Sequence, residues 1–263
     1  MIKTPLSTMV GGAGIWTPSC TVIGGQQNVD QLIKSLFADG TQGIYLNAQD
    51  AVSVSDLSSI KDLSGRNNHA TQANATSRAS LITDPSGYKS LKFDGIDDGY
   101  VTPSINFSNT DKVTVIAAIK SVLTLETYQV VIELSASIAT NNGAFVLTSP
   151  HGGVGIASFT SKGNVRSDNI LTSIQFAERV ISAQSAISND TNKLKVNGVL
   201  QGVSTDQGTG NYGNYPLYIG RRGGTSLPFS GQIYALLVIG KLLDDATTQR
   251  IEKEFAKYIG VTL

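Results

Sequence analysis

The sequence has very few of the residues that build cross-links and metal centres. Cys20 is the only cysteine in 263 residues, so no disulfide forms within the chain and no zinc site with several thiolates is available. We interpret it as an inert, partly buried thiol rather than a reactive one. His69 and His151 are the only histidines, and without cysteine partners they make a zinc centre a poor interpretation.

Charge and long apolar runs are also scarce. The 20 basic and 20 acidic residues balance to a formal net charge of zero, and charged residues make up 15% of the chain. Such a chain lacks the basic stripe that nucleic acid binding needs. No run of about 18 apolar residues could span a membrane, and the first residues lack the apolar core of a secretory signal. We therefore expect a soluble protein, made in the cytoplasm, that neither binds nucleic acid nor inserts into a membrane.

What the chain does contain is a series of strand and turn signals. The 27 glycines and the low charge favour an all-β protein with many turns over a helical one. Short apolar or alternating runs recur along the chain, and Asn197-Gly198 lies between two of them as a strong hairpin signal. The expected strands are 43–48, 89–94, 100–102, 111–121, 128–135, 143–149, 153–161, 179–187, 193–202, 215–220 and 231–243.

Two short helices are expected, one at each end of the strand region. Asn28 is a good N-cap for the first, and its apolar face consists of Leu32, Ile33, Leu36 and Phe37. The second begins at Asp244 or Asp245, carries apolar side chains at Ile251, Phe255, Tyr258 and Ile259, and ends before Gly260. With no long helix between the strands, we predict one antiparallel β-sandwich, with the C-terminal helix packed outside it.

Several segments resemble the laminin-G-like, concanavalin A-like jelly-roll family. The segments are "DLSGRNNHATQ" (62–72), "LKFDGIDDGYVT" (91–102), "KLKVNGVLQG" (193–202), "PLYIGRRGG" (216–224) and the terminal stretch from "FSGQIY" onward (229–260). They occur in the family's order. The resemblance implies an all-β jelly-roll domain over residues 43–263, preceded by an arm and short helix over residues 1–42.

The lead-in to this domain is similar to a narrower group. "LFADGTQGIYLNAQD" (36–50) together with 62–72 resembles proteins of tailed bacteriophages, in which this jelly roll is a virion component. The resemblance implies a decoration or appendage of the head or tail that contacts other virion proteins and forms a homo-oligomer. Residues 1–27 are small, polar and glycine-rich, so they would order only against a partner. We expect attachment through Trp16 and the helix residues Leu32, Leu36 and Phe37.

Three carboxylates crowd the segment "LKFDGIDDGYV". Asp94, Asp97 and Asp98 repel one another unless a cation, hydrogen-bond donors or water stabilise them. One interpretation is a Ca²⁺ site, because hard cations take several carboxylate oxygens, although the spacing does not match an EF-hand. The other is a tight turn between strands, in which Phe93 points inward, the Asp side chains cap amides, and Gly95 and Gly99 adopt positive φ. The sequence leaves both open, and no other cofactor is indicated.

Exposed aromatics beside small polar residues suggest a carbohydrate site. Tyr212 and Tyr215 lie in "NYGNYP" and Tyr100 in "GIDDGY", settings in which rings stack on sugars. The alternative is that these tyrosines cover the rim of the sandwich or an oligomer contact. A carbohydrate-binding adhesin that recognises host-surface glycans is therefore the alternative to a purely structural virion protein.

Catalytic patterns are missing. Hydrolases of this fold carry paired acids as E-x-D-x-E, whereas the five glutamates here are scattered, with Glu252 and Glu254 expected on a solvated helix face. No G-x-S-x-G accompanies the histidines, and "GTGNYG" (208–213) is followed by a strand rather than the helix that dinucleotide binding requires. We expect a binding protein and no enzyme.

Overall fold

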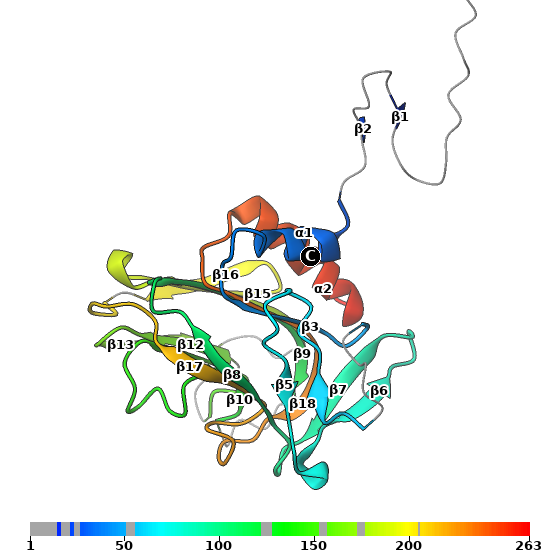
Figure 1. Cartoon of the computed structure of the whole chain (residues 1–263), viewed down its shortest axis with the longest axis horizontal. Helices are drawn as coiled ribbons and strands as arrows, with labels where there is room; N and C mark the ends of the chain where they lie inside the picture. The colour runs from blue at the N-terminus through cyan, green and yellow to red at the C-terminus, as the bar shows by residue number, and fades with distance from the viewer. Residues whose placement is uncertain are drawn as a thin grey trace, which may run out of the picture.

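The chain folds into two stacked antiparallel sheets with two helices on one side (Figure 1). This computed structural model describes residues 27–50, 56–121, 128–152, 157–172, 177–204 and 206–263, with backbone alone for 201–204 and for the pair β1 (Ile15–Trp16) and β2 (Val22–Ile23). Among these residues no helix is long and apolar enough to cross a membrane. The antiparallel sandwich predicted from the strand pattern is confirmed.

The first sheet lies beneath the helices. Its strands run in the order β16-β15-β14-β9-β18-β7-β6, with β3 paired to the far half of β18. Their bounds are β3 Gly43–Asn47, β6 Ser80–Thr83, β7 Lys89–Asp94, β9 Lys112–Ser121, β14 Glu178–Ala186, β15 Thr191–Val196, β16 Val199–Ser204 and β18 Ser230–Ile239.

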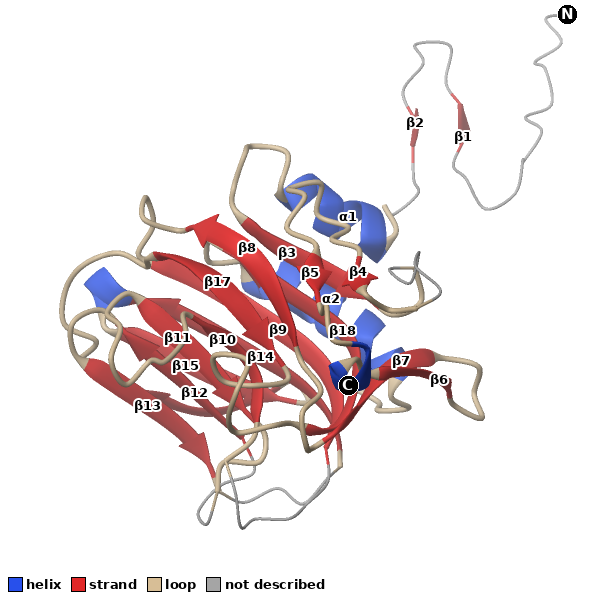
Figure 2. Cartoon of the chain, turned by 60° about the horizontal axis from the view of Figure 1, so that its bottom comes forward, coloured by secondary structure: helices blue, strands red, loops and turns tan. Residues whose placement is uncertain are grey.

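The second sheet forms the opposite layer of the sandwich (Figure 2). Its order is β13-β12-β11-β10-β17-β8-β5-β4, so strands distant in sequence alternate in space. Their bounds are β4 Ser59–Ile60, β5 Ala70–Thr71, β8 Tyr100–Asn106, β10 Val130–Leu134, β11 Ala144–Thr148, β12 Ala157–Lys162, β13 Arg166–Leu171 and β17 Asn214–Ile219.

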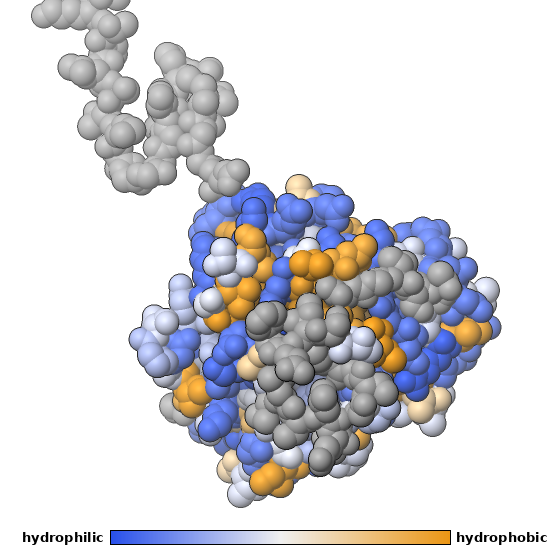
Figure 3. Space-filling view, turned by 180° about the vertical axis from the view of Figure 1, so that it is seen from behind, coloured by the Kyte–Doolittle hydropathy of each residue, from blue (hydrophilic) through white to orange (hydrophobic). Residues whose placement is uncertain are grey.

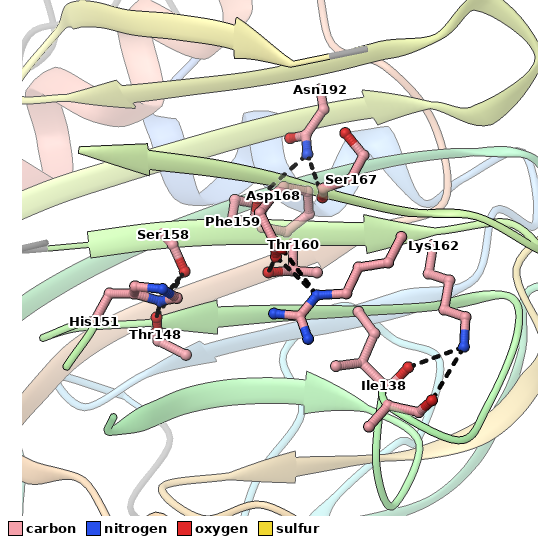
Figure 4. Close-up of polar contacts among 12 residues, drawn as sticks. Ile138, Thr148, His151, Ser158, Phe159, Thr160, Lys162, Ser167, Asp168 and Asn192 are labelled. Atoms are coloured by element: carbon pink, nitrogen blue, oxygen red, sulfur yellow. Dashed lines mark hydrogen bonds and ion pairs between the residues drawn. The ribbon is translucent and has the colours of Figure 1, made fainter. Parts of the chain in front are cut away.

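The space between the sheets holds the main core. Inward-facing side chains of both layers are almost fully buried, and β9 is buried on both faces over its middle, as its continuous apolar run predicted. A polar contact ties the layers at one edge: Asn192 of β15 donates from Nδ2 to the carbonyls of Phe159 and Ser167 in the other sheet, at 3.2 and 3.0 Å (Figure 4).

Both helices cover the outer face of the first sheet. α1 (Val29–Leu36) begins at Asn28, whose side chain accepts from the Gln31 amide, and α2 (Asp245–Tyr258) begins at Asp244, which accepts from Thr247. Their apolar faces join outward side chains of the sheet in a second core. Ile33 and Phe37 are fully buried there, so α1 belongs to the folded body, which corrects the boundary predicted at residue 42.

That packing also changes the predicted attachment surface. Phe37 is 0% exposed, so its side chain stabilises α1 on the sandwich rather than contacting a partner, whereas Leu36 is half-buried against the same cluster and its attachment role stays a prediction. Leu32 is half-buried, and the side chain of Trp16 lies outside the described residues. Attachment through the arm stays a prediction.

Turn chemistry was predicted well, and polar edge strands were missed. Asn197 and Gly198 have φ of 49° and 76° and join β15 to β16, as the Asn-Gly hairpin signal indicated. β6 and β13 are the outermost strands of their sheets among the described strands, so each pairs there with one neighbour, β7 and β12 respectively. The first four residues of β13, "RSDNIL", are all polar, so the sequence shows neither an apolar run nor an apolar–polar alternation that would predict a strand.

The described surface mixes polar and apolar residues. In the view from behind, hydrophilic residues predominate and hydrophobic ones gather in separate patches (Figure 3). Ile96, at the tip of the acidic turn, is 73% exposed.

Candidate functional site

The three acidic residues between β7 and β8 do come together. The ligand oxygens of Asp94, Asp97 and Asp98 lie within 4.8 Å of one another. Asp94 Oδ1 accepts from the amides of Ile96 and Asp97, at 2.8 and 3.3 Å. Asp98 Oδ2 accepts from the Asp94 amide at 2.9 Å, and Asp97 Oδ2 accepts from the Ser77 hydroxyl at 2.6 Å. Each carboxylate therefore stabilises the turn through an internal hydrogen bond.

The electrostatics of the cluster are set by burial. Asp98 is 5% exposed, and burial raises the pKa of its carboxyl, helped by the neighbouring charges of Asp94 and Asp97. Arg221, from the loop after β17, donates from Nη1 to the carbonyl of Asp97 at 2.8 Å. Gly95 has the expected positive φ of 79°, but Gly99 does not. A Cβ atom at position 99 would instead lie 3.1 Å from the Arg221 side chain, so that side chain would have to shift by a few tenths of an ångström to accommodate it.

Two of the three predicted sugar-stacking tyrosines are inside the sandwich. Tyr100 is 3% exposed and lies edge-on to Phe93, and Tyr212 is 1% exposed with its hydroxyl 2.7 and 2.8 Å from those of Ser161 and Ser185. Neither ring has a face in solvent, so the prediction that they stack on a glycan is wrong. Their glycine-rich neighbours are turns that lead directly into core positions.

Tyr215 is the remaining tyrosine of that set. It is half-buried, packs against the core, and donates from its hydroxyl to the carbonyl of Asn142 at 3.2 Å. The other two predicted glycan residues, Tyr100 and Tyr212, are buried and present no exposed ring beside it. The structure thus separates a set that the sequence had grouped.

A polar network lies on the outer face of β11 and β12 (Figure 4). The hydroxyls of Ser158 and Thr148 lie 2.7 and 3.1 Å from Nδ1 of His151, and 2.8 Å from each other. Burial lowers the pKa of His151, which favours the neutral ring. Because Ser158 is 0% exposed, its hydroxyl cannot reach a substrate. Its contact with His151 holds the segment after β11 against β12.

The neighbouring strand pair continues this network. Thr160 donates to the Asp168 carboxylate, which also accepts from Arg166, and Lys162 donates to the carbonyls of Ile138 and Ala139 at 3.2 and 3.3 Å (Figure 4). These contacts hold the loop after β10 over the sheet.

A groove of about 700 Å³ opens on the helical side of the molecule, between α1, the end of β3 and α2. Its walls supply amides, carboxylates, cations and one aromatic ring, and we call it the α1–α2 groove. It is lined by Gln27, Asn28, Val29, Asp30, Asn47, Gln49, Asp50, Arg250, Lys253, Glu254, Lys257 and Tyr258.

Hydrogen bonds fix the floor of the α1–α2 groove. Tyr45 donates from its hydroxyl to Asp30 Oδ1 at 2.6 Å, and Asn47 donates from Nδ2 to the hydroxyls of Tyr45 and Tyr258, at 3.1 and 3.3 Å. The Oδ1 atom of Asn47 accepts from the Gln49 amide at 3.0 Å. Three elements thus meet in one connected network, and the side chains are positioned before any ligand arrives.

Tyr258 is the aromatic part of that network. Its ring lies 5.4 Å from Tyr88 and 6.1 Å from Phe255, and it is half-buried. Burial raises the pKa of its hydroxyl to about 12, so the group keeps its proton at neutral pH. The oxygen accepts from Asn47, and the hydroxyl retains its proton as a hydrogen-bond donor.

Little in the sequence indicates this groove. Tyr258 was assigned to the apolar face of the C-terminal helix, and only packing decides that its hydroxyl end lines a cavity. Glu254 and Glu252 were expected together on a solvated face. Glu254 does line the groove, but Glu252 is 2% exposed and accepts from the Ser182 hydroxyl beneath α2. Burial raises the pKa of Glu252.

Comparisons with known proteins add information on the fold. No protein-family model matches the sequence, and a search of curated proteins gives no match. Among solved structures, domain 4 of an extracellular arabinanase of glycoside hydrolase family 43 from Geobacillus stearothermophilus, in complex with arabinotriose, matches with a TM-score of 0.57 and 16% identity. The match covers 83% of this chain and 98% of that domain.

Two toxin structures match over a similar part of this chain. The binding domain of Paraclostridial Mosquitocidal Protein 1 has a TM-score of 0.60 and 15% identity, over 85% of this chain and 56% of that one. A structure of botulinum neurotoxin type C, described with the dependence of its cell entry on two ganglioside molecules, has a TM-score of 0.56 and 12% identity, over 87% and 52%. This chain spans about half the length of these toxin structures. At such identities the likeness shows the β-sandwich fold.

Proposed function

We propose that this chain is a carbohydrate-binding module and that the α1–α2 groove is its binding site. The observation that carries the proposal is a hydrogen-bonded chain of Asp30, Tyr45, Asn47 and Tyr258 at the base of the groove, in which Tyr45 is buried and Tyr258 supplies the aromatic ring of the lining. The arabinotriose complex of one structural neighbour and the ganglioside dependence of another support it as analogies of fold.

The chemistry of the groove suits a sugar. Each sugar hydroxyl both donates and accepts, so a site needs donors and acceptors at fixed positions. Tyr258 offers a hydroxyl proton, Lys253 an ammonium group and Asp50 an exposed carboxylate, and the Tyr258 ring adds an apolar face. Binding rather than catalysis is the proposed activity, because the acidic turn and the His151 network are committed to internal contacts.

A glycan array with wild-type protein and groove variants tests this proposal. Tyr258→Phe removes one hydroxyl and Asp50→Asn one charge, and neither change removes a packed side chain. We expect both variants to bind at least about tenfold more weakly, the effect of losing one good hydrogen bond to a ligand. Tyr128→Phe is the matched control, because Tyr128 is 44% exposed and lies outside the groove. A blank array, or groove variants that bind like wild type, would contradict the proposal.

We further propose that the module is displayed on a phage particle through residues 1–27, as the sequence resemblance implies. One feature of the structure supports a separate arm: β1 and β2 pair with each other and with no strand of the two main sheets among the described residues. Removing residues 1–27 should leave a folded sandwich that no longer enters particles. Truncated protein that still assembles would remove this part of the proposal, and light scattering would show whether the full chain forms a homo-oligomer.

A further inference from the structure

The charges around the α1–α2 groove are not evenly paired. Two of its three carboxylates already have a lysine partner: Asp30 lies 2.9 Å from Lys34 Nζ, and Glu254 lies 2.6 Å from Lys257 Nζ. Asp30 also accepts from the Tyr45 hydroxyl. These two acids therefore have little charge left to offer a ligand.

Two cations of the groove lack such a partner. Arg250 donates from Nη2 to the backbone carbonyl of Gln27 at 2.7 Å, and in the part of the chain that the structure describes it forms no ion pair. Within those same residues Lys253 forms none either, and its side chain is exposed. Among the described residues, Asp50 is the one lining carboxylate without a lysine partner, and it is exposed. The groove thus presents two available cations against one available carboxylate.

The spacing of these cations along α2 is that of a single helix face. Arg250 and Lys253 are three residues apart, so their side chains leave the helix as neighbours about 5–6 Å apart at Cβ. Tyr258 follows Lys253 by five residues, a rise of about 7.5 Å along the axis. All three side chains line the groove, with the two cations nearer the start of α2 and Tyr258 at its last residue.

We propose that the ligand of the α1–α2 groove is an anionic glycan, in which Arg250 and Lys253 bind a carboxylate or sulfate carried by one sugar residue. The guanidinium keeps unused N–H donors in a planar fork that matches such an anion, and the ammonium adds a second positive charge. Tyr258 and Asp50 then contact hydroxyls of the same or the adjacent sugar. This inference rests on the proposed function, because it names the class of sugar for that same site.

Calorimetric titration with matched oligosaccharides tests the inference. The pairs are a uronic acid oligomer and its neutral counterpart of the same linkage, and a sulfated oligomer and its unsulfated counterpart. We expect at least one anionic member to bind about tenfold or more tightly than its neutral partner, as one charge-assisted contact predicts. That preference should fall as salt is added, because partly exposed charges are screened.

Two variants connect the preference to these residues. Arg250→Gln and Lys253→Gln should each remove most of the difference between anionic and neutral sugars, while Lys61→Gln, an exposed lysine elsewhere, should keep it. If neutral sugars bind as tightly as anionic ones, or if the preference survives both groove variants, this inference is overturned and the carbohydrate-binding proposal stands. If no sugar of either kind binds, both fall.

Discussion

Arg221 donates from Nη1 to the carbonyl of Asp97 in the acidic turn, at 2.8 Å, although the two residues are 124 positions apart in the sequence. The contact joins the loop after β17 to the turn between β7 and β8. The arginine stem also passes close to Gly99, where an added Cβ atom would lie 3.1 Å from it.

Removing this arginine should loosen the turn. We expect Arg221→Met to lower the free energy of unfolding by about 1–2 kcal/mol, because a charged donor to a fixed carbonyl is lost. Arg166→Met makes the same chemical change at an exposed ion pair with Asp168 and should cost less than about 0.5 kcal/mol. Urea unfolding of the two variants measures the difference, and equal losses would mean that Arg221 does not stabilise the turn.

Asp98 should make the protein less stable as its carboxyl ionises. Its folded pKa is raised by burial, so the wild type loses stability as pH rises from the ordinary aspartate pKa through that higher value. Asp98→Asn keeps an acceptor for the Asp94 amide and cannot ionise. We expect it to be more stable than wild type at neutral pH and to lose that advantage in acid. Asp98→Ala, which has no acceptor for the Asp94 amide, should be less stable than wild type at neutral and at acid pH. Urea unfolding of wild type and both variants across this pH range checks these expectations.

Calcium should not stabilise the acidic turn if its carboxylates serve only as internal acceptors. Calcium takes six to eight oxygen ligands, whereas here one oxygen of each Asp already accepts a protein hydrogen bond. We therefore expect the same melting temperature with millimolar calcium and with a chelator. An increase in melting temperature with calcium, absent from the variant that combines Asp97→Asn and Asp98→Asn, would establish the metal site instead.

Arg222 neutralises a carboxylate in the middle of the second sheet. Its Nε lies 2.8 Å from Glu133, which is 0% exposed and also accepts from the Ile138 amide at 2.6 Å. Arg222→Met leaves that charge unpaired and should cost about 3 kcal/mol at neutral pH. Burial raises the pKa of Glu133, so protonation should relieve the loss in acid. Combining Arg222→Met with Glu133→Gln should recover most of the stability, and a double variant as unstable as Arg222→Met alone would contradict this account.

His151 should make the protein sensitive to mild acid. Burial lowers its folded pKa, so the stability it contributes is complete above the ordinary histidine value of 6.5 and is lost as pH falls through the lower folded value. His151→Gln retains a hydrogen-bonding side chain and does not titrate. We expect its unfolding free energy to change less between neutral pH and about pH 5 than that of the wild type. If the unfolding free energies of the two proteins change in parallel with pH, His151 is not the cause of the acid sensitivity.

Local signals in the sequence were sufficient for much of the fold. Asn28 and Asp244 cap the two helices, Asn197-Gly198 forms the hairpin, and the long apolar run of β9 is buried on both faces. In each case the cause lies within a few neighbouring residues, whose backbone preference or apolar period does not depend on the rest of the chain.

Exposure could not be predicted in the same way. Tyr100, Tyr212 and Glu252 stand among polar or glycine-rich neighbours, yet all three are buried. Distant strands cover the two tyrosines, and Glu252 lies on the side of α2 that packs against Ser182 of β14. Local composition reports what a segment can do, and burial depends on what packs over it.

The sequence by itself determined an antiparallel all-β sandwich with a capped helix at each end, because alternation, turn residues and caps act over short distances. Tertiary structure decided which polar groups face solvent. It buried Tyr100 and Tyr212, two of the three tyrosines predicted to stack on sugars, and gave each carboxylate of the acidic turn a hydrogen bond within the protein. By packing α1 and α2 on one sheet it placed Asp30, Asn47 and Tyr258 around a single groove. These residues lie more than 200 positions apart at the extremes, and only the folded chain brings them into contact.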